Sequence, residues 1–171
     1  MIAKIKDAKI HKAVIIDTEK TIFEAASIIK KEKVPTLLLR DEKGEMYIVT
    51  DSDFRQKVIL NRMDFDDKVI KIASKGLIYV NEDDFLFNAQ LTMAKHGLKR
   101  VVVQNDKKEI VGILDQISLS SFFATNTFAV SNQIVNAETV EELKEASKKK
   151  KKIIRSLNAK GVKIEFIAKL I

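Results

Sequence analysis

The sequence predicts a mixed α/β (α+β) protein built from two copies of one β-α-β-β-α unit, followed by a helical extension. Three observations support this prediction: an internal repeat, the strand and helix patterns within each copy, and a change of composition near the end. We expect a first repeat over residues 1–62, a second over residues 63–124 and the extension over residues 125–171.

The repeat is visible when residues 14–45 are aligned with residues 78–109 without a gap. Apolar positions match apolar positions almost throughout, and one inserted residue then aligns residues 47–49 with residues 112–114. A unit of about 65 residues is too long for one solenoid repeat and has the size of a small subdomain that occurs twice. We therefore expect the two copies to pack about a pseudo-twofold axis.

Each copy shows the same order of hydrophobic patterns: a strand, a helix, two strands and a closing helix. Thr21 and Glu24 predict a capping box at the start of the first helix, and Asp83 or Asp84 is expected to cap its equivalent. The expected elements of the first copy are 14–16, 22–32, 36–39, 46–50 and 52–61. Those of the second copy are 78–80, the helix after residue 84, 100–103, 109–114 and 116–124.

The junction between the third strand and the closing helix carries a candidate site. Residues 47–49 are apolar and lead into Thr50, and Asp53 follows three positions later. Thr-x-x-acid is a helix-capping signal, and the N-terminus of a helix also attracts phosphate groups. A carboxylate can accept two hydrogen bonds from a ribose diol. The same residues are therefore compatible with a cap, a nucleotide site or both.

This order of elements and this junction resemble a tandem CBS domain pair, also called a Bateman module, over residues 2–124. In that family the junction reads Gly-h-x-Thr/Ser-x-x-Asp, where h is apolar. The first copy departs from it only at Tyr47, which replaces the glycine. The second copy keeps Gly112 but has Asp115 in place of the hydroxyl and Ser118 in place of the acid.

The resemblance implies an adenine nucleotide (AMP, ADP or ATP) in the cleft between the repeats, and no required cofactor. It implies that Asp53 binds the ribose, that Thr50 supports the phosphate and that the adenine lies between apolar strand residues. Basic residues before the second strand of a repeat often face ligand phosphates in this family. The candidate ligand-binding residues are Val14, Thr36, Ile48, Thr50, Ser52, Asp53, Lys99 and Arg100.

The resemblance also implies a regulatory, ligand-sensing module, and we expect it to control an effector domain attached in a longer parent protein. The alternative is a ligand-free structural or dimerisation module, which the departures in the second copy favour. No enzyme is expected, because His11 and His96 have no acidic or nucleophilic companion at a useful spacing and cysteine is absent. No metal site is expected for the same reason.

Residues 125–171 predict helices at about 126–136, at 139–159 and at 163–171. Thr139 and Glu142 form the capping box of the middle helix. The segment resembles the linker that opens nucleotidyltransferase regions in bacterial proteins, where it follows a CBS pair. We therefore expect the attached effector domain to be a signalling or nucleotidyltransferase domain.

Charge and hydropathy argue against nucleic acids and membranes as partners. Ten of the 31 Lys and Arg residues but only five of the 24 Asp and Glu residues lie in residues 129–171, so the main domain is close to neutral. The run of lysines at 148–152 would surround a helix, without aromatic residues between them, so no nucleic-acid partner is expected. No apolar run is long enough to span a membrane and no signal peptide is evident, so we expect a cytoplasmic protein.

A second copy of the chain is the remaining expected partner. CBS pairs commonly associate through their helices, and both closing helices carry more apolar residues than a small domain usually exposes. We therefore expect a homodimer. The residues expected at its interface are Phe54, Val58, Ile59, Leu60, Ile117, Leu119, Phe122 and Phe123.

Overall fold

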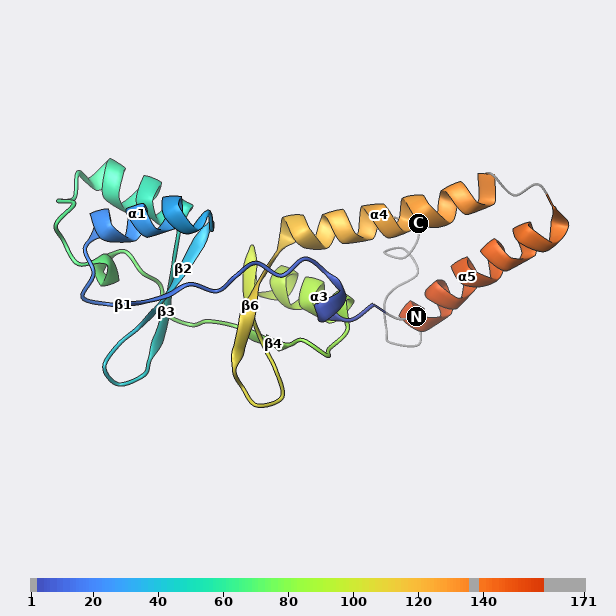
Figure 1. The fold of residues 1–171 in the computed structure, drawn as a ribbon, viewed down its shortest axis with the longest axis horizontal. Helices are drawn as coiled ribbons and strands as arrows, with labels where there is room; N and C mark the ends of the chain where they lie inside the picture. Colours follow the sequence, from blue (N-terminus) through green and yellow to red (C-terminus); the bar gives the residue numbers. More distant parts are fainter. Residues whose placement is uncertain (1–2, 136–138, 159–171) are drawn as a thin grey trace. The chain divides into compact units, whose positions relative to one another are not determined.

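The computed structural model describes residues 3–135 and 139–158, and its elements have the predicted order (Figure 1). The first repeat contains β1 (Ile15–Asp17), α1 (Ile22–Glu32), β2 (Thr36–Arg40), β3 (Met46–Thr50), α2 (Asp51–Asp53) and the π-helical segment η2 (Phe54–Ile59). The second contains η3 (Val69–Lys71), β4 (Tyr79–Asn81), α3 (Leu86–His96), β5 (Arg100–Gln104) and β6 (Ile110–Asp115). The remaining elements are η1 (Ile5–Asp7), α4 (Gln116–Val135) and α5 (Val140–Asn158).

Each repeat forms a three-stranded sheet, with strand orders β1-β2-β3 and β4-β5-β6. The first two strands of each sheet are parallel, and β3 runs antiparallel to β2. Ile15 lies opposite Leu38 in the first sheet, and Tyr79 lies opposite Val102 in the second. These pairs occupy equivalent positions of the sequence repeat, so the predicted α/β fold with two equivalent units is confirmed.

The repeats exchange short segments at the third strand of each sheet. His11, which precedes β1, donates its N–H to the Ile113 carbonyl over 2.8 Å and accepts the Ile113 N–H over 2.9 Å. Ser74, which precedes β4, forms the same pair of hydrogen bonds with Ile48, over 2.9 and 3.0 Å. Because Ile48 and Ile113 are equivalent in the repeat, the exchange is reciprocal, as a pseudo-twofold relation requires.

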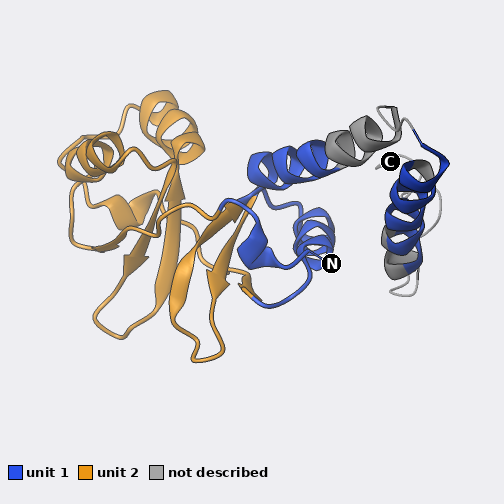
Figure 2. Cartoon of the chain, turned by 45° about the vertical axis from the view of Figure 1, so that its right-hand side comes forward, with its two compact units in different colours: residues 1–9, 83–99, 115–171 blue, residues 10–82, 100–114 orange. Residues whose placement is uncertain are grey.

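The chain divides into two compact units, and all residues of the exchanged pairs belong to one of them (Figure 2). The sheet unit comprises residues 10–82 and 100–114, and therefore holds residues 10–62 of the first repeat together with nearly all of the strand residues of the second. The helical unit comprises the described residues of segments 1–9, 83–99 and 115–171.

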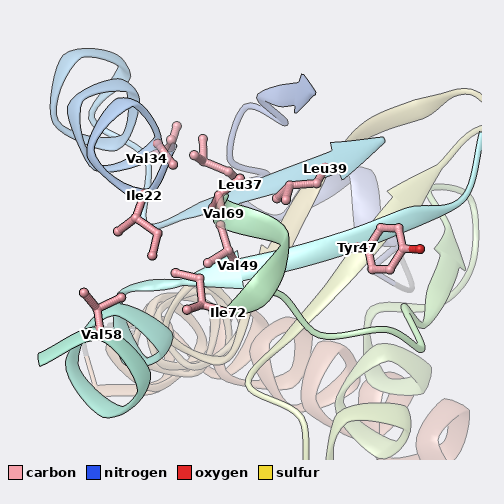
Figure 3. Close-up of a cluster of buried hydrophobic side chains, with 10 residues drawn as sticks. Ile22, Val34, Leu37, Leu39, Tyr47, Val49, Val58, Val69 and Ile72 are labelled. Carbon is pink, nitrogen blue, oxygen red and sulfur yellow. The ribbon is translucent and has the colours of Figure 1, made fainter. Parts of the chain in front are cut away.

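The core of the first repeat lies between the helices and one face of its sheet (Figure 3). Successive strand residues point to opposite faces, so Leu37 packs toward the helices while Leu38 packs against the second sheet. Val102 and Ile113 complete this second cluster between the sheets, in which all three residues are at most 2% exposed. The buried members of the first cluster are Ile22, Ala25, Val34, Leu37, Leu39, Tyr47, Val49, Val58, Val69 and Ile72.

Tyr47, which replaces the glycine of the expected motif, belongs to this first core. Its side chain is 8% exposed, and its hydroxyl lies 3.2 Å from the Asp41 carboxylate and 3.0 Å from that of Glu45. Burial raises the pKa of the Tyr47 hydroxyl, and the hydrogen bond to Glu45 adds to this effect. The Lys75 ammonium lies 5.1 Å from the ring centroid. The first repeat thus accommodates a large side chain at this position.

In the helical unit, α4 is continuous over Gln116–Val135, so the prediction of separate helices at 116–124 and 126–136 is wrong. No glycine or proline lies within this range, and the Asn126 side chain donates to the Phe122 carbonyl one turn earlier, over 2.8 Å. The capping box of α5 is confirmed by reciprocal 3.2 Å hydrogen bonds between Thr139 and Glu142. The expected helix at 163–171 lies outside the described residues.

The start of α3 also differs from the prediction. Phe85 occupies the N-cap position without a side-chain hydrogen bond, so the prediction of Asp83 or Asp84 as the cap is wrong. The Asp83 carboxylate instead lies 2.7 Å from the ammonium groups of both Lys4 and Lys6. Hydrogen bonds to charged donors are stronger than a bond to one neutral N–H group, which accounts for this orientation.

These ion pairs predict an acid-dependent contribution to stability. Hydrogen bonds from Lys4 and then Lys6 lower the pKa of Asp83 from 3.8 to about 2. A group whose pKa is lower in the folded state stabilises the fold above its unfolded pKa, and the contribution is lost as pH falls toward the folded pKa. We expect Asp83→Asn to flatten the fall of Tm between about pH 4 and pH 2 in calorimetry.

The matched control for this experiment is Asp66→Asn, which removes an exposed carboxylate of the sheet unit. In this control, Tm should fall between about pH 4 and pH 2 as steeply as in the wild type. A wild-type slope in the Asp83→Asn protein would show that the lysine pairs do not stabilise the fold.

Candidate functional site

The candidate site lies where β3 ends and α2 begins. The antiparallel register places Thr50 opposite Thr36, the first residue of β2. Ile48 lies two residues before Thr50 and therefore on the same face of the sheet, the face that packs against the second sheet. The fold thus brings Thr36, Ile48 and Thr50 together, as a shared site requires.

Thr50 and Asp53 form a closed hydrogen-bonded pair. Oδ2 of Asp53 accepts the Thr50 backbone N–H over 2.8 Å and the Thr50 hydroxyl over 2.8 Å. The Asp53 side chain is only 15% exposed. The carboxylate therefore satisfies a backbone N–H group at the helix start, which is the part of the capping box that the motif predicts for the acid, while the Thr50 hydroxyl donates to the same carboxylate oxygen.

Lys57 binds the other carboxylate oxygen. Its Nζ lies 2.8 Å from Oδ1 of Asp53, donates to the Ile72 carbonyl over 2.6 Å and lies 3.4 Å from Oγ of Ser74. Sequence reasoning missed Lys57, although a lysine four positions after an acid on a helix is a recognisable pairing signal. Its contacts with Ile72 and Ser74 carried no sequence signal, because they join distant segments.

The equivalent junction in the second repeat is an ordinary helix cap. Asp115 accepts the Ser118 N–H over 2.7 Å, and both residues are less than 9% exposed. The hydroxyl and the carboxylate have exchanged places relative to the first repeat. Phe122 occupies the position that aligns with Lys57. The second junction therefore differs from the first in both charge and hydrogen bonding.

Two predicted site residues carry buried polar atoms without a partner among the described residues. These atoms are Oγ1 of Thr36 and Nε of Arg100. The two residues are the first of β2 and β5 and are equivalent in the repeat. A buried polar atom that lacks a hydrogen bond costs about 1–3 kcal/mol, so native proteins keep few of them without a functional or solvent-related reason.

The other predicted site residues are placed as follows. The Val14 side chain packs against the core of the first repeat, on the opposite face of the sheet from Ile48, and its carbonyl accepts the Leu38 N–H over 2.9 Å. Ser52 is half-buried in α2. Lys99 is exposed and belongs to the helical unit, whereas the other predicted residues belong to the sheet unit.

An open groove of about 610 Å³ lies near the hairpin turns of the sheet unit and contains none of the predicted site residues. Residues 3–135 and 139–158 contain no group of three or more His, Asp or Glu side chains placed to bind a metal ion. Within the same residues, no helix combines the length and the apolar character needed to cross a bilayer.

Comparison with known proteins agrees with this geometry. Residues 69–124 match the family model of the CBS domain. The CBS domain pair of protein MJ0100, solved with 5′-methylthioadenosine and S-adenosyl-L-methionine, is similar with a TM-score of 0.63 and 24% identity over 74% of this chain and 99% of that chain. The CBS domain protein PAE2072 from Pyrobaculum aerophilum, solved with AMP, is similar with a TM-score of 0.60 and 24% identity. The match covers 71% of this chain and 98% of that chain. The chain therefore has the fold of a CBS domain pair.

Among curated proteins, the carnitine transport ATP-binding protein OpuCA of Listeria monocytogenes is 30% identical over 131 residues. The match covers 74% of this chain but 32% of OpuCA. The chain spans about a third or less of the length of the first curated relatives it matches. The family model ends at residue 124, so the likeness of the later residues to a nucleotidyltransferase linker stays a prediction.

Proposed function

We propose that this chain is a regulatory module that binds an adenine nucleotide (AMP, ADP or ATP) at the junction of β3 and α2. Asp53 would accept the ribose hydroxyls, Thr50 would support the phosphate, and Ile48 would contact the base. The conformational change caused by binding would control an effector domain that is attached to the chain in a longer protein. The proposed domains are the first CBS repeat over residues 1–62, the second over residues 63–124 and the helical extension over residues 125–171.

The observation that carries the proposal is Oγ1 of Thr36, which has no hydrogen-bond partner among the residues that the structure describes and belongs to the residue paired with Thr50. Thr36 is 1% exposed and lies opposite Thr50 in the strand register. A ligand with hydroxyl or phosphate groups at this position would supply the missing partner. Solved CBS domain proteins of the same fold contain AMP or S-adenosyl-L-methionine, which supports an adenine ligand for this chain.

The alternative, a ligand-free structural or dimerisation module, is favoured by a specific observation. Both oxygens of the Asp53 carboxylate already accept hydrogen bonds from donors of the chain itself. In this alternative the junction is only a helix cap, and Lys57 links it by a hydrogen bond to the Ile72 carbonyl, in the segment that follows η3.

Thermal unfolding with separate additions of AMP, ADP, ATP, S-adenosyl-L-methionine and a cyclic dinucleotide distinguishes the two functions. A ligand at 100 times its Kd stabilises the folded state by about 2.7 kcal/mol. For a protein of this size that corresponds to a rise in Tm of roughly 5–10 °C. No rise with any compound at millimolar concentration would favour the ligand-free module.

The predicted dimer surface needs a correction. Val58 and Leu119 were expected at the interface, but they are 3% and 2% exposed and lie inside the chain's own core. They are buried because each lies on the inward face of its helix. Phe54 is also partly buried against the first core. The expected residues that are largely exposed are Ile59, Leu60 and Ile117.

Two further exposed aromatic residues extend this surface on the sheet unit. Phe23 is 62% exposed and Phe65 is 60% exposed, and the Phe23 N–H donates to the Phe65 carbonyl over 3.0 Å. Ile59 and Leu60, which are 66% and 75% exposed, precede Phe65 in the same connection. We propose that this apolar surface contacts a second copy of the chain.

We expect light scattering to give the mass of a dimer at tens of micromolar protein. Leu60→Lys should shift the protein to a monomer, because a charge in an apolar interface is costly to desolvate. Leu91→Lys is the matched control, since Leu91 is 49% exposed on α3 and belongs to the helical unit. A monomeric wild-type protein, or an unchanged dimer in the Leu60→Lys protein, would contradict the proposed interface.

A further inference from the structure

The Asp53 carboxylate has little hydrogen-bonding capacity left for a ligand. A carboxylate offers about four acceptor positions, two on each oxygen. Oδ2 uses both of its positions for the N–H and the hydroxyl of Thr50, and Oδ1 uses one for Lys57. Counting contacts from the described part of the chain, one position remains, whereas a ribose diol donates two hydrogen bonds. A diol can therefore be fully bound only if one of these donors leaves.

The geometry points to Lys57 as the donor that leaves, an inference that rests on the proposed function. The Thr50 N–H is fixed in the backbone at the helix start, and the adjacent hydroxyl donates to the same carboxylate oxygen. Lys57 is instead 36% exposed at the end of a flexible side chain. Its departure opens both positions on Oδ1 and leaves the cap intact. Lys57 is thus an internal competitor of the ribose for Asp53.

Displacement of Lys57 also changes the connection between the repeats. The same ammonium group donates to the Ile72 carbonyl and lies beside the Ser74 hydroxyl. Ile72 follows η3, and Ser74 forms the exchanged pair with Ile48 that joins the segment before β4 to β3. Occupation of Asp53 by a ribose therefore removes one of the bonds that hold this segment. Lys57 couples the binding of a ribose to the connection that leads into the second repeat.

The test uses adenosine, which carries the ribose diol but no phosphate, so that a new lysine–phosphate contact cannot compensate. By calorimetry on the full chain, we expect Lys57→Met to bind adenosine about three- to tenfold more tightly than the wild type, as loss of one partly exposed competing ion pair predicts. Lys57→Arg, which keeps the charge, should bind like the wild type. Lys71→Met is the matched control, because Lys71 forms an equivalent ion pair with the acid four residues earlier, which is Asp67 rather than Asp53.

Amide hydrogen exchange without ligand tests the coupling separately. The Ser74 and Ile48 amides, which form the exchanged pair, should exchange about three- to tenfold faster in Lys57→Met than in the wild type or in Lys71→Met. Lys57→Arg keeps the charge, so exchange at the wild-type rate in this variant would show that the charge, rather than the lysine side chain itself, holds the segment.

The outcomes separate this inference from the proposed function. If adenosine binds the wild type and Lys57→Met equally well, the competitor role is wrong while the nucleotide site stands. If AMP binds the wild type but adenosine binds neither protein, only the competitor role is overturned. If neither AMP nor adenosine binds either protein, both the nucleotide site and the competitor role are overturned. If exchange at Ser74 is the same in both proteins, the coupling to the second repeat is wrong whatever the affinities.

Discussion

Replacement of Asp53 by alanine is expected to weaken adenine-nucleotide binding by about 1.5–3 kcal/mol, the usual contribution of hydrogen bonds to a charged group. The same change removes the acceptor of the Thr50 N–H and hydroxyl and the partner of Lys57. We therefore also expect a loss of about 1–3 kcal/mol in the free energy of unfolding, because partly buried donors are left unpaired. Urea unfolding and calorimetric titration measure the two effects independently.

Two variants separate the roles of Asp53. Asp53→Asn keeps an acceptor for the Thr50 N–H but loses the charge that attracts Lys57, so its stability should lie between those of the wild type and the alanine variant. Asp51→Ala, an exposed acid of the same helical turn, should leave the affinity unchanged. Wild-type affinity in a folded Asp53→Ala protein would mean that the junction is only a helix cap.

Replacement of Gly112 by alanine is expected to destabilise the protein by about 2–4 kcal/mol, from overpacking and strained hydrogen bonds. A Cβ atom at Gly112 would lie 2.4 Å from the His11 carbonyl oxygen and 2.4 Å from Cγ2 of Ile10. The obstructing oxygen is a backbone atom, and it accepts the Ile113 N–H, so it cannot move without loss of the exchanged pair. The corresponding fall in Tm is roughly 5–15 °C.

Val111→Thr is the control for this prediction, because Val111 is 41% exposed in the same strand and threonine has a similar shape. It should change the free energy of unfolding by less than about 0.5 kcal/mol, as is usual for surface positions. A loss below about 1 kcal/mol in Gly112→Ala would show that the segment around His11 can shift without cost.

The departures from the expected motif have separate structural explanations. Gly112 is required where the carbonyl of an exchanged segment approaches the strand, whereas Tyr47 at the equivalent position packs into a core. Asp115 accepts the Ser118 N–H as in a helix cap, and Phe122 occupies the position that aligns with Lys57. Any ligand-binding role of the second junction would therefore depend on different contacts from those of the first.

Two of the predictions that failed concern features for which local sequence signals do not distinguish between neighbouring residues. Asp83 and Asp84 are good capping residues, but two lysines that lie far away in the sequence bind Asp83 instead. Val58 and Leu119 have the same apolar character as their exposed neighbours, and only the packing of their helices decides which face is buried. Composition alone could not separate these cases.

The sequence by itself determined the two repeats, the order of their strands and helices, the capping boxes at Thr21 and Thr139, and the pairing of Thr50 with Asp53. These features depend on residues close together in the chain, where hydrophobic period and capping chemistry act locally. Only the tertiary structure decided the exchange of segments between the sheets and the contacts of Lys57 with Ile72 and Ser74. Such contacts join segments distant in sequence, and their geometry arises only when the two sheets pack together.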